Sequence, residues 1–180
     1  MTKRPALRLL AIAASILAAG VTTSHAGGQP RPASLQARTV QVAGSGVDRL
    51  DTSIVHSEEP TATGMVQRST QTVDLTGDLA GRVLYHVTSV FDFAAGTLVN
   101  TGEQVYSGTV AGSAPVLLYD DEFRFEVNLV TGEESGQVYL LDSLAGPKVG
   151  CTLDVAGTGL DAAGNPTFVY TGECIFRGGR

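Results

Sequence analysis

The chain has 180 residues, with two cysteines and no tryptophan, and 18 acidic against 12 basic residues give it a formal net charge of −6. Its length suits one domain with a real hydrophobic core. The acidic balance argues against nucleic acid or an anionic membrane surface as a partner.

The N-terminal 26 residues have the three parts of a secretory signal peptide. Three basic residues within the first eight positions precede an apolar run over residues 9–19, and residues 24–26, Ser-His-Ala, offer a small-residue cleavage site. The alternative is an N-terminal membrane anchor, although the apolar run is much shorter than a membrane span. We predict cleavage of residues 1–26, secretion to the periplasm or the extracellular medium, and no membrane insertion after processing.

Residues 27–36, which include two prolines, are predicted to form a flexible leader, and the domain is expected over residues 37–180. Ten short extended runs follow, separated by gaps that hold Gly, Pro or Asp. The runs are 38–43, 50–57, 66–75, 82–93, 98–109, 116–119, 122–130, 137–144, 149–157 and 167–176. No stretch of the mature chain shows a sustained apolar period of 3.6 residues. We predict an all-β fold, a single antiparallel barrel of about eight main strands, in preference to a sandwich.

The run 82–93 has the clearest strand pattern. Five of its six odd-numbered residues are apolar or aromatic, against two of the six even-numbered ones, so the odd-numbered residues should face the interior. A four-residue loop would pair this run with the run 98–109 in a defined register. The expected pairs are Phe93–Leu98, Phe91–Asn100, Ser89–Gly102, Val87–Gln104 and Tyr85–Tyr106.

A second hairpin is expected between the runs 122–130 and 137–144. The expected pairs are Phe123–Leu144, Phe125–Asp142, Val127–Leu140 and Leu129–Val138. This register places Asp142 on the apolar face. Two other readings stay open, since Asp142 could lie in water at the end of the strand, or the register could differ.

The two cysteines, Cys151 and Cys174, lie symmetrically about a loop over residues 161–166. Their pairing sets large residues opposite small ones and polar opposite polar. The expected pairs are Leu153–Gly172, Val155–Tyr170, Gly157–Phe168, Thr152–Glu173 and Asp154–Thr171. A secreted protein with two cysteines brought together by a hairpin should form the disulfide, in preference to a catalytic or metal-binding thiol.

Metal ligands are sparse in the mature chain. His56 and His86 are too isolated in the sequence to form a zinc site, and His86 lies on the polar face of its strand. The acidic run 120–122, with Glu133 and Glu134 nearby in sequence, could bind calcium, although acidic loop residues are more often simply solvated. We predict no metal and no cofactor.

The glycine spacing resembles that of a known family. Residues 77–81 lead into Tyr85, glycines follow at 96, 102 and 108, and residues 157–160, Gly-Thr-Gly-Leu, follow an apolar strand. Over roughly residues 65–164 this is similar to the allene oxide cyclase and dirigent barrels and to small bacterial proteins that share that barrel. The resemblance implies an eight-stranded antiparallel barrel, often a homo-oligomer, with an apolar cavity in which a hydrophobic substrate is folded for cyclisation or coupling. No family catalytic residue matches a position in this chain.

Two function classes remain open, and the sequence does not decide whether the protein is an enzyme. In the first, the barrel binds a small hydrophobic molecule, with a cyclase, isomerase or dirigent-like activity as the resemblance implies. The candidate ligand-binding residues are Tyr85, Phe91, Phe93, Gln104, Tyr106, Phe123, Phe125, Asp142 and Tyr170. In the second, the interior is solidly packed and the protein is a secreted structural or interaction module.

The outer face of the 82–109 hairpin stays apolar at Leu84, Val90, Val99 and Val105. A monomeric barrel would place these side chains in water. We expect them to be covered, either by a second chain in a homo-oligomer or by the N-terminal segment.

Overall fold

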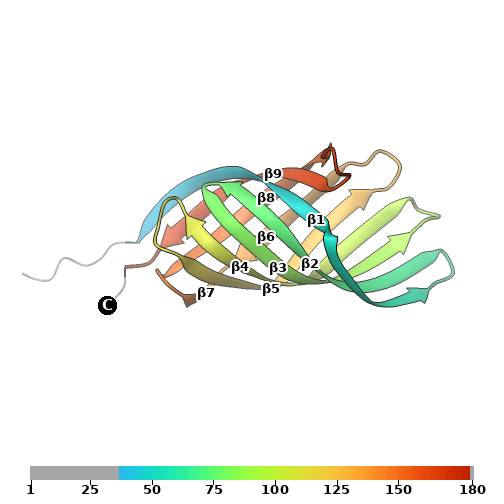
Figure 1. Ribbon diagram of the computed structural model, residues 1–180, viewed down its shortest axis with the longest axis horizontal. Helices are drawn as coiled ribbons and strands as arrows, with labels where there is room; N and C mark the ends of the chain where they lie inside the picture. Colours follow the sequence, from blue (N-terminus) through green and yellow to red (C-terminus); the bar gives the residue numbers. More distant parts are fainter. Residues whose placement is uncertain (1–36, 179–180) are drawn as a thin grey trace, which may run out of the picture. The chain divides into compact units, whose positions relative to one another are not determined.

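The computed structural model describes residues 37–178, and these residues form nine β-strands and no helix (Figure 1). The strands are β1 (Arg38–Pro60), β2 (Gly64–Gly77), β3 (Leu79–Asp92), β4 (Thr97–Val110), β5 (Val116–Asn128), β6 (Glu134–Leu140), β7 (Asp142–Ala145), β8 (Val149–Leu160) and β9 (Pro166–Phe176). The predicted signal peptide, 1–26, and leader, 27–36, lie outside the described residues. Within residues 37–178, no helix is long and apolar enough to span a membrane.

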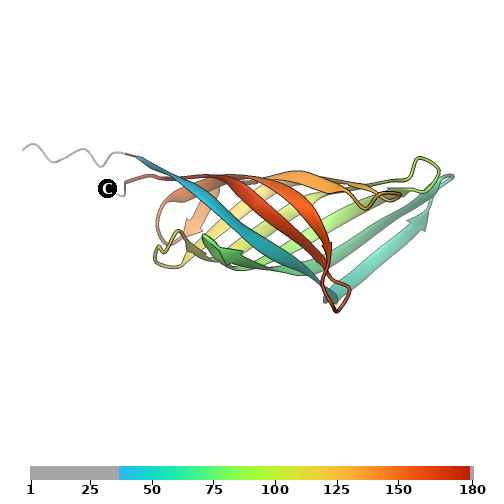
Figure 2. The ribbon, with the colours of Figure 1, turned by 90° about the horizontal axis from the view of Figure 1, so that it is seen from above.

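The strands close into a barrel. Each of β1 to β5 pairs with the next strand in sequence, β5 pairs with β6, β6 with β8, β8 with β9, and β9 returns to β1. All these pairs are antiparallel, and β7 is an extra short strand that pairs with β5. The predicted all-β antiparallel barrel is therefore confirmed. Figure 2 shows the strands crossing the long axis obliquely, as closure of a barrel requires.

Two long strands were each predicted as two short runs. The runs 38–43 and 50–57 belong to the single strand β1, whose pairing with β2 shifts register between Arg49 and Ile54, where the ribbon bends (Figure 1). The runs 116–119 and 122–130 belong to β5, which has a bulge between the pairs that Asp120 makes with Gln104 and Phe123 makes with Gly102 of β4. A bulge inserts one residue into one strand, so the inward-facing positions change from even to odd numbers and the alternation looks interrupted.

The predicted register of the β3–β4 hairpin is wrong by two residues. Phe91, not Phe93, pairs with Leu98, and the loop is residues 93–96. Asp92 Oδ1 accepts hydrogen bonds from the backbone N–H groups of Ala94 and Ala95 at 3.1 and 2.9 Å, which ends the ladder before Phe93. A shift of two keeps every side chain on its face, so Tyr85 and Phe91 still face inward, whereas Phe93 lies exposed in the loop.

The predicted pairing of residues 122–130 with 137–144 is wrong by six residues. Phe125 pairs with Gly136, where an added Cβ would lie 2.3 Å from the Phe125 ring. Because the ring lies across the glycine, this large-to-small pair sets the register. β6 ends at Leu140, and Asp142 opens β7, where it pairs with Tyr119 and is exposed. Asp142 is therefore not on the apolar face.

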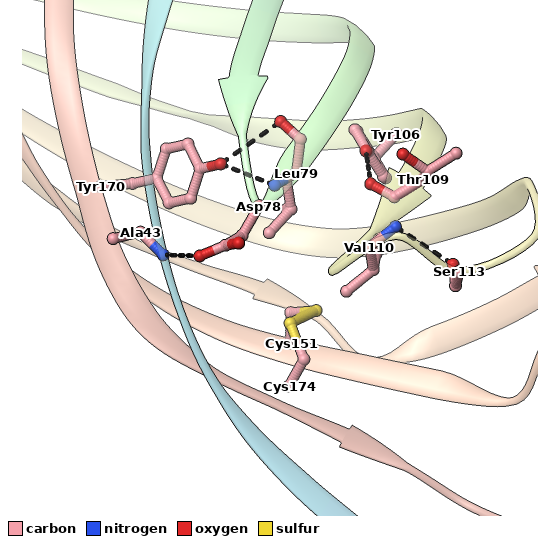
Figure 3. The surroundings of a disulfide bond; sticks show 10 residues. All are labelled: Ala43, Asp78, Leu79, Tyr106, Thr109, Val110, Ser113, Cys151, Tyr170 and Cys174. Atoms are coloured by element: carbon pink, nitrogen blue, oxygen red, sulfur yellow. Dashed lines mark hydrogen bonds between the residues drawn. A yellow bond between two sulfur atoms is a disulfide. The ribbon is translucent and has the colours of Figure 1, made fainter.

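The predicted C-terminal hairpin is confirmed. Cys151 and Cys174 pair and are joined by a disulfide, and both are fully buried (Figure 3). The predicted pairs on both faces of the hairpin are all present. A bulge between Gly157 and Gly159 then brings the two strands to the loop at residues 161–165.

The hydrophobic core fills the end of the barrel that holds the disulfide. Its largest buried side chains are Tyr106 and Tyr170, packed with aliphatic residues from β1 to β6 and from β8. The Tyr106 phenol donates to the carbonyl of Thr109 at 2.6 Å, so its polar atom is satisfied within the core (Figure 3). This half of the molecule has the properties of a packed core.

The four apolar residues expected on the outer face of the β3–β4 hairpin pair with one another there, as Leu84–Val105 and Val90–Val99. Leu84 and Val90 are exposed in the single chain. Their cover by a second chain or by the N-terminal segment stays a prediction.

Candidate functional site

The barrel interior is not filled at its other half. A cavity of about 90 Å³ adjoins the core, and all eight strands of the closed barrel contribute to its lining. Most of the lining is aliphatic or aromatic, including Val73, Val83, Phe123 and Leu153. We call this space the inner cavity.

A wider depression of about 450 Å³, the mouth, lies toward the end of the barrel where the β1–β2, β3–β4, β5–β6 and β8–β9 connections are. Leu50, Phe91, Leu98 and Leu160 contribute apolar surface to it. The mouth and the inner cavity share five lining residues, so the two spaces adjoin. Four of the shared residues are polar and form what we call the polar collar: Asp48, Tyr85, Asn100 and Glu134.

Asp48 projects into the interior from β1. Its Oδ2 accepts a hydrogen bond from the phenol of Tyr85 at 2.8 Å, and its Oδ1 is buried without a hydrogen-bond partner. Burial raises the pKa of Asp48 from 3.8 to about 6, although the bond from Tyr85 opposes the shift. Asp48 is therefore an inward carboxyl group that exchanges its proton near neutral pH.

Tyr85 lies between two acceptors. Its phenol oxygen is 2.8 Å from Asp48 Oδ2 and 2.8 Å from Gln71 Oε1. A phenol has only one proton to donate. Both contacts are therefore hydrogen bonds when Asp48 is protonated, because Asp48 then donates to Tyr85 and Tyr85 donates to Gln71. Burial, and then the nearby charge of Asp48, raise the pKa of Tyr85, which keeps the phenol neutral.

Glu134 and Asn100 complete the polar collar. Glu134, at the start of β6, is half-buried, and its pKa is raised by burial and then by the charge of Asp48. The Oδ1 atom of Asn100, on β4, is buried and has no hydrogen-bond partner. The polar collar thus presents two carboxyl groups, a neutral phenol and unsatisfied acceptor atoms to the interior.

The structure brings together some of the residues predicted from the sequence. Those that line the inner cavity are Tyr85, Gln104, Phe123, Phe125 and Tyr170. Phe91 lies in the mouth. Three others lie elsewhere: Tyr106 is enclosed in the core, Phe93 is 61% exposed in a loop, and Asp142 is exposed outside the barrel. Phe93 and Asp142 were placed wrongly because both hairpin registers were wrong.

Gln104 has a structural partner. Its Nε2 donates to Asp120 Oδ2 at 2.9 Å, and the same carboxylate oxygen accepts from the backbone N–H of Tyr139 at 3.0 Å. Asp120 Oδ1 accepts from the N–H of Glu122 across the β5 bulge. The acidic run 120–122 is thus divided between a buried structural carboxylate and exposed side chains. Among the described residues, no group of three or more His, Cys, Asp or Glu side chains could hold a metal ion.

Asp48 was not among the residues predicted from the sequence, and Glu134 was considered only as a possible calcium ligand. Both lie in predicted gaps, although the inward positions of their strands reach them. In β1, inward Val42 is followed by Gly44 and Gly46 and then Asp48, and in β6 Glu134 precedes Gly136 and inward Val138. The intervening glycines hid the alternation, because a glycine reads as a turn although here it makes room for an aromatic ring.

The chemistry available in the polar collar is hydrogen bonding, charge pairing and proton exchange. Asp48 and Glu134 can accept hydrogen bonds or a proton, and Tyr85 can donate a hydrogen bond.

Comparisons with family models, with curated proteins and with solved structures find no match to this chain. The resemblance to allene oxide cyclase and dirigent barrels therefore stays a prediction.

Proposed function

We propose that this protein is a secreted β-barrel that binds one small, largely apolar molecule in its inner cavity and the adjoining mouth. The observation that supports this proposal is the unfilled apolar space that adjoins an open mouth. A barrel of eight strands is wide enough either to be filled by its own side chains or to hold one small ligand. Apolar walls with a few polar groups are the usual lining of such a site.

Secretion is part of the proposal. The buried Cys151–Cys174 disulfide suggests an oxidising, extracellular environment. The N-terminal sequence pattern supports export independently.

The competing proposal is a packed structural module. Its support is the core around Tyr106 and the disulfide, where the Tyr106 hydroxyl is satisfied by Thr109. That core occupies one half of the barrel. The other half holds buried acceptor atoms on Asp48 and Asn100 without partners, which a core selected for stability alone would avoid.

A cyclase or isomerase activity is a second candidate, and the arrangement of Asp48 and Tyr85 favours it. A carboxyl group with a pKa of about 6 can give or take a proton near neutral pH, and the phenol contacts it directly. An isomerisation that moves a proton within a bound apolar molecule would use these groups.

Uptake of a neutral apolar fluorescent probe, N-phenyl-1-naphthylamine, tests the binding proposal. We expect the wild-type protein to enhance the probe's fluorescence, and Leu98→Trp to reduce the effect by narrowing the mouth. Val99→Trp is the matched control, since Val99 is the next residue of β4 and pairs with Val90 on the outer face. A native mass spectrum of protein purified from its host should also show a retained small molecule.

No uptake by the wild type, together with no retained molecule, would overturn the proposal in favour of the packed module. Equal loss of uptake in Leu98→Trp and Val99→Trp would show that the probe binds outside the barrel. A thermal unfolding curve of each variant establishes that it is folded.

A further inference from the structure

We propose that the ligand carries a protonated amine, and that the polar collar binds this amine while the apolar part of the molecule occupies the adjoining inner cavity and mouth. This inference rests on the proposed binding function and adds the chemistry of the ligand's polar group. It is carried by three features of the interior: unsatisfied acceptors, two carboxyl groups and, among the described residues that line it, no Lys, Arg or His.

The unsatisfied atoms are both acceptors. Asp48 Oδ1 and Asn100 Oδ1 are buried without a hydrogen-bond partner and belong to residues that line the inner cavity and the mouth. A buried acceptor without a donor is unfavourable, and a ligand that supplies donors removes that cost. A primary ammonium group has three donors and no acceptor, which suits such a site.

The charge of the interior also favours a cationic ligand. Asp48 and Glu134 both line the two spaces, and no Lys, Arg or His of the described residues lines either one. The neighbouring Arg49 is engaged elsewhere, because its guanidinium pairs with Asp51 and Asp74 at 3.0 and 3.3 Å. A cationic ligand would supply the partner that a buried carboxylate needs, whereas an anionic ligand would be repelled.

Aromatic rings next to the polar collar favour the same charge. Tyr85 and Phe123 form an edge-to-face pair with ring centroids 5.8 Å apart, and both line the inner cavity. The face of an aromatic ring attracts a cation. The rings of Phe125 and Phe168 add apolar surface for the body of the ligand.

The size of the two spaces limits the ligand. The inner cavity, of about 90 Å³, is smaller than the cavity of about 150 Å³ that holds benzene in another protein. An aromatic or branched aliphatic body therefore extends from the inner cavity into the mouth. The polar collar lies where the two spaces adjoin, so the amine lies at the junction of the inner cavity and the mouth.

The test uses three probes that share a naphthalene ring and differ in charge: 2-(1-naphthyl)ethylamine, 2-(1-naphthyl)ethanol and 1-naphthaleneacetate. Binding to the full mature protein is measured by titration calorimetry at pH 7.5. We expect the amine to bind at least tenfold more tightly than the alcohol, and the acetate to bind most weakly. Asp48→Asn should remove most of the difference between amine and alcohol while leaving alcohol binding in place.

Glu173→Gln is the matched control, because Glu173 is an exposed carboxylate on β9 that lines neither space. It should bind all three probes as the wild type does. Glu134→Gln provides a second variant within the polar collar, and it should also reduce the preference for the amine. Together these variants separate an effect of the collar from an effect of net charge.

The outcomes distinguish this inference from the binding function. If amine and alcohol bind equally to the wild type, or if both collar variants keep the preference, the amine inference is wrong and the binding function stands. If the wild type binds none of the three probes and takes up no neutral apolar probe, both are wrong. Tighter binding of the acetate would overturn the amine inference alone.

Discussion

The phenol oxygen of Tyr170 accepts a hydrogen bond from the backbone N–H of Leu79 at 2.7 Å, although the two residues are 91 positions apart in the chain (Figure 3). The same phenol donates to the carbonyl of Thr76 at 3.0 Å. The ring reaches this position over Gly44, where a Cβ would lie 2.2 Å from the phenol oxygen. These two hydrogen bonds link β9, across β1, to the turn between β2 and β3, and so stabilise the closed barrel.

Tyr170→Phe should lower the free energy of unfolding by about 1 to 3 kcal/mol, because the buried N–H of Leu79 loses its acceptor. Urea unfolding measures the change. Tyr139→Phe is the control, since its phenol donates to Gln137 on the exposed surface and its loss should cost less than about 0.5 kcal/mol. Equal effects of the two substitutions would contradict the role given to Tyr170.

Replacing both cysteines by alanine should lower the free energy of unfolding by about 3 kcal/mol. The disulfide closes a loop with a sequence separation of 23, and loop-closure entropy of the unfolded chain gives this magnitude. Denaturant unfolding of the oxidised protein and the double variant makes the comparison. Thiol titration of the unfolded, unreduced protein should find no free thiol, and two free thiols would refute the bond.

Asp48→Asn should stabilise the protein in a pH-dependent way. Burial raises the pKa of Asp48 to about 6 in the folded state, so the folded protein holds this proton more tightly than the unfolded chain does. The stability that the proton contributes is present below about pH 4 and is lost as the pH rises to about 6, by up to about 3 kcal/mol for two pKa units. The uncharged Asn avoids that loss.

The two proteins should therefore be similarly stable at pH 3.5, and the variant should be the more stable at pH 7. The titratable groups that face Asp48 are Tyr85, which stays neutral, and Glu134, whose own pKa shift should shrink when the charge of Asp48 is removed. Urea unfolding between pH 3.5 and 7.5 measures the difference, with Glu173→Gln as the control. A difference that does not change with pH would show that Asp48 is solvated.

Asp120→Ala should lower the free energy of unfolding by about 2 to 4 kcal/mol. The substitution leaves the side-chain amide of Gln104 and the backbone N–H groups of Tyr139 and Glu122 without their acceptor. The neighbouring Asp121 is exposed, so Asp121→Ala should change stability by less than about 0.5 kcal/mol. Thermal or urea unfolding measures the stability of the two variants. Similar losses of stability would mean that the bulge does not depend on the carboxylate of Asp120.

The all-β fold and the C-terminal hairpin could be predicted from the sequence because their signals are local. Alternation of side chains over residues 82–93 identifies a strand and its inward face. The two cysteines determine one register, and the large-to-small pair Gly157–Phe168 lies within it. These signals need no knowledge of the rest of the chain.

The other two registers could not be predicted, for a physical reason. A shift of two residues between β3 and β4 leaves every side chain on its face, so alternation cannot detect it, and the hydrogen bonds of Asp92 to the loop decided it. For the second hairpin, a shift of six residues also leaves Phe125 and Val127 on their face, and the contact of the Phe125 ring with Gly136 decided the register. Asp142 was misplaced as a result.

The sequence by itself determined that the strands have one apolar face, that the C-terminal hairpin carries a disulfide, and that phenols and amides lie among the apolar residues. Only the tertiary structure decided which of them surround open space. Asp48 and Glu134 come from β1 and β6, which are not neighbours in the sheet, and they influence each other only because the barrel closes. Their approach across the interior depends on the strand tilt and register of the whole barrel, which no local pattern records.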